Sequence, residues 1–509
     1  MLRRTALMFL MSGIAGCFLH AQEPVTPDAS PEAKALLRYL YSISGKQILA
    51  GQHNFPNSGS RNTVFAGDFI GKTPPVWSQD FGFAAEGDKD SYLARPEIIR
   101  EAIRQHRNGY LVTLCWHAVP PTAEEPVTFQ PVRGADPSAP LASVQGRLTD
   151  KQFRDILTRR TDLYNRWVKQ VDEIAGFLKQ LSDAKVPVLW RPYHEMNGDW
   201  FWWGGRYQGK YTTAALYRQL FDRLVNYHKL DNLIWVWSVD RPGQPGREFV
   251  NYYPGNEYLD ILSIDIYGND FNQSYYDGLL ALSNGKPVTL GEVGNPPSPE
   301  IIAQQPDWIY WVVWAGMVRG TSFADYGKLT ADPRVVFMED RSYLDGTADY
   351  RRACGLDPVK IDRAAHFTGE WRLNEAESSS MGGQGRTVPP YKIMVKQEGD
   401  QISVKSFSAV EWDDDEVADI TLKLDGSDNK STGFMNSPRV QNANWSAERD
   451  TLTILSKVTM KFGEKPPVEM KSSEVWTLQK RGKKLHIIQT SEGMTGRGPV
   501  SSLSVYDKY

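Results

Sequence analysis

The sequence predicts an α/β protein, a (β/α)8 TIM barrel followed by a smaller all-β C-terminal domain. Two observations carry this prediction. Between about residues 32 and 355, eight short apolar runs alternate with longer segments of helical periodicity, the pattern of parallel strands joined by helices. After residue 366, short alternating runs are separated by turn pairs such as Asp425-Gly426 and Arg481-Gly482. This second pattern indicates an antiparallel barrel or sandwich.

The predicted barrel strands are short runs rich in β-branched and aromatic residues. They cover residues 47–51, 75–78, 110–116, 186–190, 233–237, 261–265, 287–291 and 310–314. Helices are expected between them, for example over residues 151–181 and 213–228, where apolar residues recur at helical spacings. An open doubly wound sheet is the alternative. We prefer the barrel because neither a Gly-x-Gly-x-x-Gly turn after the first strand nor a phosphate loop occurs.

These patterns divide the chain into four parts: residues 1–21, a barrel domain over 32–355, a linker over 356–366 and a β-rich accessory domain over 367–509. The accessory domain loosely resembles a lipocalin-like barrel. It carries Trp371, Trp412, Trp445 and Trp476. Tryptophans spread through alternating strands are more often core residues than a carbohydrate-binding face, and we expect the core role.

Composition excludes some partners. A formal net charge of -3 over 509 residues provides no basic surface for nucleic acid. Sixteen tryptophans are many for this length, and they suit a protein that stacks aromatic rings on a ligand.

The N-terminus has the order of a secretory signal. Arg3 and Arg4 precede an apolar run over about residues 6–19, which is too short for a comfortable membrane span. We favour cleavage near Ala21. The residues ending at Cys17 also resemble a bacterial lipobox, which would place a lipid on that cysteine. The protein is therefore expected to be secreted, periplasmic or on the cell surface. No later segment is long and apolar enough to span a membrane.

Two cysteines remain if the signal is removed. Cys115 lies in an apolar strand pattern and is expected to be a small core residue. A disulfide between Cys115 and Cys354 is possible in an oxidising compartment, but the sequence alone leaves the pairing open.

Polar or aromatic residues follow most of the predicted strands. They include His53, His117, His194, Glu195, Asp240, Tyr267 and Glu292. Because the C-terminal strand ends of a barrel meet at one mouth, these residues are expected to lie together. The long Pro-rich segment over residues 120–148 is predicted to be a loop walling the same face, with a tethered surface loop as the alternative.

The segment over residues 191–204 mixes Arg191, His194, Glu195 and Asn197 with three tryptophans. It begins like the zinc motif His-Glu-x-x-His, but Gly198 stands where the second histidine ligand is required. A plain core or surface loop is disfavoured because neither needs both kinds of residue. A cleft that binds sugars does, with aromatic faces for the sugar ring and polar groups for its hydroxyls.

The chemistry of glycoside hydrolysis uses two carboxyl groups, one protonated and one ionised. Glu195 ends the fourth strand, and Glu292 ends the seventh between two glycines. We predict that these residues form the pair. In a retaining enzyme the two carboxyl groups lie about 5–5.5 Å apart.

Three motifs resemble glycoside hydrolase family 26, chiefly endo-β-1,4-mannanases. They are Gly-Lys-x-x-x-x-Gly-Gln-His ending at His53, Arg-Pro-x-His-Glu-Met-Asn-Gly-x-Trp-x-Trp-Trp ending at Trp203, and Leu-Gly-Glu-x-Gly ending at Gly294. The resemblance covers roughly residues 32–350. It implies that Glu195 is the general acid/base and that Glu292 is the nucleophile.

The resemblance also implies substrate-binding residues. Trp200 would line the cleft beside the cleaved bond, and Tyr267 would hydrogen-bond the nucleophile. His117 would contact the sugar at the reacting position, and His194 would bind substrate and help to set the environment of the acid. Trp314 would form the stacking floor. Four of them lie at or shortly after predicted strand ends, and Trp200 lies further along the segment that follows the fourth strand.

We therefore expect a secreted retaining endo-β-1,4-mannanase that acts on mannan, galactomannan or glucomannan, as a monomer, without a cofactor or catalytic metal. The same fold and mechanism on β-1,3-xylan or mixed-linkage β-glucan is the alternative. A non-catalytic glycan-binding protein is disfavoured because both carboxylates are present.

Overall fold

The computed structural model describes residues 23–55, 59–82, 95–134, 136, 138–359, 361, 364–379, 389–410, 414–433, 436–461, 466–479, 482–492 and 499–509. The predicted signal over residues 1–21, with Cys17, lies outside the described residues, as do Trp412 and part of the predicted linker. The chain divides into two compact units, Met1–Lys360 and Ile361–Tyr509.

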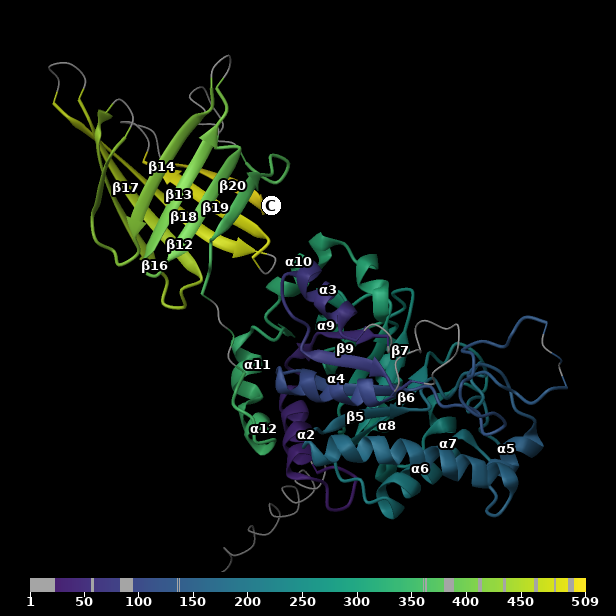
Figure 1. Ribbon diagram of the computed structural model, residues 1–509. Coiled ribbons are helices and arrows are strands. Elements are labelled where there is room, and N and C mark those ends of the chain that lie inside the picture. The colour runs from purple at the N-terminus through teal and green to yellow at the C-terminus, as the bar shows by residue number, and fades with distance from the viewer. Residues whose placement is uncertain are drawn as a thin grey trace, which may run out of the picture. The chain divides into compact units, whose positions relative to one another are not determined.

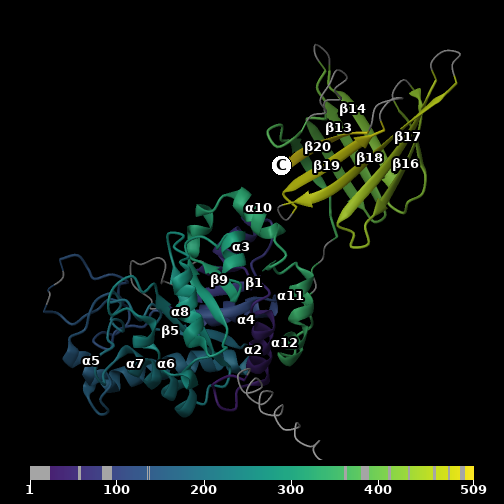
Figure 2. The same ribbon diagram turned by 180° about the vertical axis from the view of Figure 1, so that it is seen from behind.

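The first unit contains the predicted barrel. Its parallel strands follow one another in chain order from β2 to β8, and β9 closes the ring by pairing with both β8 and β2. The first barrel strand is interrupted at Ala50, so that β1 pairs with β9 and with the extra strand β10. Figures 1 and 2 show the helices on the outside of these strands. The predicted (β/α)8 fold is confirmed.

The strands of this unit are β1 (Ile48–Leu49), β2 (Gly51–Asn54), β3 (Val76–Asp80), β4 (Leu111–Trp116), β5 (Val188–Pro192), β6 (Leu233–Asp240), β7 (Ile261–Ile266), β8 (Val288–Val293), β9 (Trp308–Val313) and β10 (Val335–Val336). The α-helices are α2 (Pro31–Ile43), α3 (Arg61–Ile70), α4 (Arg95–Arg107), α5 (Asp150–Ile156), α6 (Asp162–Asp183), α7 (Thr213–Phe221), α8 (Gln273–Ser283), α9 (Pro299–Gln304), α10 (Phe323–Ala331), α11 (Arg341–Gly346) and α12 (Ala348–Ala353).

One predicted helix is two helices in the structure. The segment 151–181 is split into α5 and α6 by a turn in which Arg160 adopts a φ of 71°. Each helix has its own N-cap: Thr149 forms a capping box with Gln152, and the Thr161 hydroxyl accepts from the Tyr164 amide. Two caps satisfy two sets of free amides, so the chain can turn without leaving unpaired donors.

The helix predicted over residues 213–228 is present, but its second half is a π-helix, η3 (Asp222–Tyr227). Short 3-10 helices lie in later connections: η4 (Phe249–Tyr252), η5 (Asn256–Tyr258) and η6 (Ala315–Gly320). Among the helices described, none combines the length and the apolar character that a membrane crossing needs.

The second unit is one antiparallel sheet of ten strands in the order β14-β13-β12-β11-β20-β19-β18-β17-β16-β15. The sheet curls into a nearly closed barrel (Figure 1). Its strands are β11 (Gly369–Leu373), β12 (Lys392–Glu398), β13 (Gln401–Ser408), β14 (Glu416–Lys423), β15 (Asn429–Thr432), β16 (Pro438–Trp445), β17 (Thr451–Met460), β18 (Val468–Gln479), β19 (Lys484–Ser491) and β20 (Val500–Lys508). The predicted all-β domain is confirmed.

The three described tryptophans of this unit belong to its core. Trp371 and Trp476 are buried, and Trp445 packs in parallel against Phe367 with ring centroids 5.7 Å apart. Alternating residues of the strands supply the remainder of this core. For these three residues, the core role expected from the sequence is the one observed.

Both described cysteines are free thiols and both are buried. The disulfide between Cys115 and Cys354 that the sequence left open is therefore not formed.

Candidate active site

The residues singled out from the sequence gather at the C-terminal ends of the barrel strands. His117 directly follows β4, Tyr267 directly follows β7 and Trp314 directly follows β9. Glu292 is the penultimate residue of β8, and Glu195 lies three residues beyond β5. Parallel strands in a closed barrel direct these positions to one mouth.

Glu292 is held through both carboxylate oxygens. The Arg191 guanidinium donates to Oε1 at 2.5 Å, and the Tyr267 hydroxyl donates to Oε2 at 2.7 Å. Both contacts stabilise the negative charge and fix the plane of the carboxyl group. The hydrogen bond that the sequence resemblance implied for Tyr267 is present.

Arg191 binds a second buried carboxylate. Its Nη1 donates to Asp265 Oδ2 at 3.0 Å, and the Ser238 hydroxyl donates to the other oxygen of Asp265 at 3.1 Å. Burial raises the pKa of Asp265 well above its ordinary value, and the charge of Arg191 opposes that rise. One guanidinium therefore bridges two acidic side chains on β7 and β8.

Glu195 has a different environment. The indole N–H of Trp200 donates to its Oε2 at 2.6 Å. Burial raises the pKa of Glu195 well above its ordinary value, and the charges of Asp265 and Glu292 raise it further. The hydrogen bond from Trp200 acts in the opposite direction. A carboxyl group that keeps its proton at neutral pH can act as a general acid.

The turn that carries Glu195 is strained and closely packed. Tyr193 and Glu195 both have positive φ, 51° and 48°, which is unusual for residues other than glycine. The Asn197 side chain fastens the turn to β6, because its amide donates to the Asp240 carbonyl at 2.6 Å and accepts from the Asp240 amide at 2.7 Å. Such strain is sustained only where the surroundings fix the backbone.

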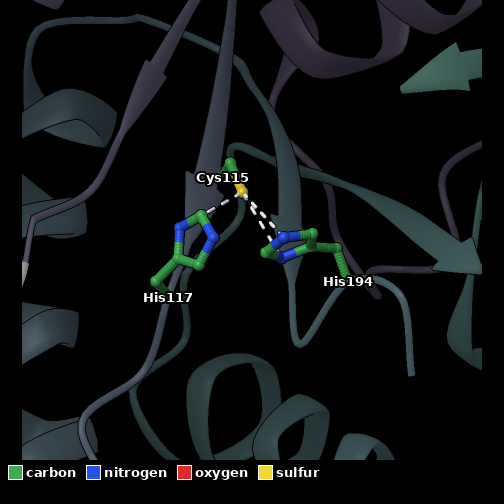
Figure 3. A group of neighbouring side chains, drawn as sticks. All are labelled: Cys115, His117 and His194. Atoms are coloured by element: carbon green, nitrogen blue, oxygen red, sulfur yellow. Dashed lines mark hydrogen bonds between the residues drawn. The ribbon is translucent and has the colours of Figure 1, made fainter. Parts of the chain in front are cut away.

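Two histidines, His117 and His194, lie on either side of the Cys115 thiol (Figure 3). The Cys115 sulfur is 3.5 Å from His194 Nδ1 and 3.9 Å from His117 Nδ1. The His194 Nε2 atom is 3.7 Å from Glu292 Oε1, and burial lowers the pKa of His194 well below its ordinary value. His194 is therefore neutral at neutral pH and can both donate and accept a hydrogen bond.

Asp80, at the end of β3, orients the second histidine. Its Oδ2 lies 2.7 Å from His117 Nδ1. A carboxylate at that nitrogen favours a proton there, which leaves the opposite ring nitrogen to face a ligand.

Among the residues that the structure describes, two groups of side chains carry donor atoms of metal-ligating types within 4.8 Å of one another: Cys115, His117 and His194, and His194, Asp265 and Glu292. In the first group, burial raises the pKa of the Cys115 thiol well above its ordinary value, so the sulfur stays protonated. In the second, Arg191 already supplies a positive charge to both carboxylates. We interpret both groups as hydrogen-bond networks around Glu292.

Trp314 lies beside His53 and His117. It is partly exposed, whereas the neighbouring Trp311 is buried. Its indole stacks on the ring of His53 with centroids 3.9 Å apart and an interplanar angle of 12°, and it meets His117 edge-on at 6.2 Å. An aromatic face fixed in this way suits the stacking role that the resemblance implied.

The long loop over residues 120–148 packs against two rings near the site, those of His117 and Phe201. Phe129 meets the ring of His117 at 5.4 Å and that of Phe201 at 6.1 Å, and Gln145 forms a β-bridge with Phe201. On the opposite side, a hollow of about 460 Å³ opens beyond β8, lined in part by Asn269, Phe271, Asn295 and Thr321.

The structure thus brings together all seven predicted site residues. It adds three that the sequence did not assign: Asp80, Arg191 and Asp265. Asp265 ends a predicted strand, and Arg191 opens the most specific motif. The sequence therefore indicated where both residues lie in the barrel. Their pairing was not visible, because Arg191 contacts partners 74 and 101 residues away.

Comparison with known proteins agrees with the site. The family model described as "Glycosyl hydrolase family 26" matches residues 25–330. A mannan endo-1,4-beta-mannosidase from Thermothelomyces thermophilus is 35% identical over 300 residues, which are 57% of this chain and 56% of that protein. The chain spans about half the length of the curated relatives it matches.

Solved structures give the same family. GH26A from a Muricauda species is 40% identical, with a TM-score of 0.56 over 61% of this chain and 98% of that one. The GH26-CBM35 beta-(1,4)-mannanase of Podospora anserina is 28% identical, with a TM-score of 0.51 over 65% of this chain and 70% of that one. Because the family model matches more than half of the sequence, the chain belongs to glycosyl hydrolase family 26.

Proposed function

We propose that this protein is a retaining endo-β-1,4-mannanase that uses Glu195 as general acid/base and Glu292 as nucleophile. The observation that carries the proposal is the contrast between the two carboxyl groups. Burial and neighbouring negative charge keep a proton on Glu195. In contrast, Arg191 donates a hydrogen bond to one oxygen of Glu292 and Tyr267 donates one to the other. Glycoside hydrolysis by double displacement needs one carboxyl group in each state.

In the first step, an oxygen of Glu292 attacks the anomeric carbon while Glu195 gives its proton to the glycosidic oxygen, which leaves with the departing sugar. A covalent glycosyl-enzyme results. Trp200, which is hydrogen-bonded to Glu195, would line the leaving-group side of the broken bond. His194, which lies 3.7 Å from Glu292, and His117, whose ring meets that of His194, would contact the sugar that becomes attached.

The second step uses the change in charge at Glu292. Once Glu292 is esterified it is no longer negative, so one cause of the raised pKa of Glu195 disappears. Glu195 then takes a proton from water, which attacks the anomeric carbon and releases the sugar with its original configuration. Neither step requires a metal or a cofactor.

Mannan is the proposed substrate because the relatives that match this chain are named as mannanases. A panel of mannan, galactomannan, glucomannan, β-1,3-xylan and lichenan tests this. Short oligosaccharides from the mannans, with the β anomer formed first, are expected. Preference for xylan or lichenan would overturn the substrate but not the mechanism, and binding without any hydrolysis would favour a glycan-binding protein.

The catalytic roles are tested by substitution. Glu195→Ala should lower kcat/KM on mannan by roughly 10²–10⁴-fold, and less on an aryl glycoside whose leaving group needs no proton. Glu292→Ala should lose hydrolysis of both. Glu173→Ala, at an exposed site on α6, is the matched control. Hydrolysis near the wild-type rate by the Glu292 variant would overturn the assignment.

We also propose that the protein is exported and acts as a monomer. Residues 1–21 have the charge and apolar order of a secretory signal. N-terminal sequencing and mass measurement of the exported protein distinguish cleavage near Ala21 from lipidation at Cys17. Light scattering of the same sample tests the monomer.

A further inference from the structure

The interior of the second unit is divided into an apolar part and a polar part. Strand register identifies its inward-facing side chains, because Ile454 and Trp476 belong to the core and residues two apart in a strand face the same side. Trp476 pairs with Leu452 and Ile487, both buried and apolar. The inward positions further along the same strands include seven polar side chains, beside the apolar Val458, Met470 and Val500: Arg439, Gln441, Ser456, Ser472, Glu474, Gln489 and Ser502.

Exposure changes along the same direction. Trp476 and Ile454 are buried, whereas Glu474, Ser472 and Ser456 are partly exposed. Gln489 and Ser502, on the neighbouring strands, are also partly exposed. These inward positions are therefore less completely buried than the apolar core around Trp476, except for Gln441, which is buried. Figure 1 shows strands β16, β17 and β18, which carry most of these positions.

Glu474 lies at the boundary between the two parts. Its Oε2 accepts a hydrogen bond of 2.9 Å from the Trp476 indole N–H. Burial raises the pKa of this carboxyl group, while the positive charge of Arg439 lowers it. A carboxyl group inside a barrel is costly unless it serves a partner, and Glu474 is only partly exposed.

Gln441 supplies a second, independent observation. It is 4% exposed, and its Nε2 donates to the Ser456 hydroxyl at 3.0 Å. Its Oε1 has no hydrogen-bond partner among the described residues. A buried amide oxygen without a donor is unfavourable by about 1–3 kcal/mol, and such positions in native proteins are often completed by a ligand or water.

We propose that this end of the barrel binds a polyhydroxylated ligand, the end of a mannan-type oligosaccharide, through Glu474 and Gln441, where the polar side chains meet the buried core around Trp476. Sugar hydroxyls donate to a carboxylate and an amide oxygen, and they accept from serine hydroxyls and a guanidinium. A lipid chain would satisfy none of these polar groups. The choice of a mannan-type saccharide rests on the proposed function of the first unit.

The test uses the full chain carrying Glu292→Ala, so that saccharides bind without being cleaved. Calorimetric titration with β-1,4-mannotriose is expected to show two sites, one in the cleft and one in the barrel. Adding Glu474→Leu should weaken the second site by roughly ten- to hundredfold, the effect of one hydrogen bond to a charged group, and leave the first unchanged.

Glu469→Leu is the matched control. Glu469 lies on the same strand as Glu474, but its side chain faces outward, where it forms an ion pair with Lys457. It should bind like the parent. If Glu474→Leu does not fold, as judged by thermal unfolding, Gln441→Leu replaces it with the same expected loss. A single site in the parent, or equal binding by the Glu474 and Glu469 variants, would overturn the proposal.

Competition by laurate for the second site would also overturn it, in favour of a lipid ligand. Hydrolysis of mannan by the wild-type chain is measured separately. Mannan hydrolysis with no Glu474-dependent site contradicts this proposal alone, whereas a Glu474-dependent site without hydrolysis contradicts only the proposed catalytic function.

Discussion

Trp200 and Glu195 are joined by a 2.6 Å hydrogen bond from the indole N–H to the carboxyl Oε2. This is the contact that lowers the pKa of Glu195, against burial and three neighbouring carboxylates that raise it. The indole is held from outside by the Arg247 guanidinium, 5.0 Å from the ring centroid, which is itself paired with Asp199 at 2.8 Å. The proton affinity of the proposed acid therefore depends on where one tryptophan ring lies.

Trp200→Phe should keep an aromatic ring in the cleft and remove the donor. Because the hydrogen bond favours the ionised carboxylate, its loss raises the pKa of Glu195. The alkaline limb of kcat/KM against pH, which reports deprotonation of the acid in the free enzyme, should then move to higher pH. Trp308→Phe removes an indole hydrogen bond to Gln305 and should leave the limb in place. A shift to lower pH would contradict this account.

Gly198→Ala should displace the same ring. A Cβ at this position would lie 2.2–2.5 Å from three atoms of the Trp200 ring, far inside van der Waals contact. The ring must then move away from Glu195, and a displacement of about 1 Å at a reacting group costs roughly 10²-fold in rate. Gly176→Ala, in α6 with no atom near its Cβ position, should retain full activity. Wild-type kcat/KM in the Gly198 variant would show that the ring is not fixed there.

Arg191→Met should destabilise the protein as well as inactivate it. The substitution leaves Asp265 and Glu292 buried without their shared positive charge, and breaking a buried ion pair costs about 3–5 kcal/mol. The loss of unfolding free energy should be smaller at pH 5 than at pH 8, because protonation can neutralise the stranded carboxyl groups. Urea unfolding at both pH values measures it. Arg341→Met, at an exposed pair with Asp345, should change little at either pH.

The barrel and the carboxylate pair could be predicted from sequence because both depend on local signals. Apolar runs at regular intervals mark the strands, and the residue type after each run shows what lies at the mouth. The break between α5 and α6 was missed because the apolar spacing continues across it. Arg160 adopts a left-handed backbone conformation at the break, and an arginine in the sequence does not indicate that conformation. The positive φ of Glu195 could not be predicted either, because a glutamate in the sequence does not indicate a left-handed conformation.

Contacts between strands that are far apart in the sequence could not be predicted either. Arg191 was visible as part of a motif, but its role depends on Asp265 and Glu292, which only the closed barrel places beside it. The role of Gly198 is a similar case. In the sequence it counted only against a zinc site, whereas in the structure the missing side chain makes room for the Trp200 ring.

The stability of the first unit should decline in acid through His106. This histidine, on α4, is buried with its Nδ1 3.0 Å from the Tyr350 hydroxyl of α12, and its carbonyl accepts from Arg351 at 2.7 Å. Burial, with the positive charge of Arg351, lowers its pKa from 6.5 to about 3. The neutral form is therefore the one that the fold accommodates, and protonation would bury a second positive charge beside the first.

A histidine whose pKa is lower in the folded state contributes stability above its unfolded pKa of about 6.5, and this contribution is lost as the pH falls toward 3. Between pH 6.5 and pH 5 the expected loss is roughly 2 kcal/mol, at 1.36 kcal/mol per pH unit. His106→Gln should lose less unfolding free energy over this interval than the wild type, measured by urea unfolding at both pH values. Tyr350→Phe removes the hydroxyl but leaves the histidine buried, so it should keep the wild-type dependence. Equal pH dependence in the wild type and His106→Gln would show that this histidine is not the group that titrates, because a glutamine at its position cannot take up the proton whose burial the fold disfavours.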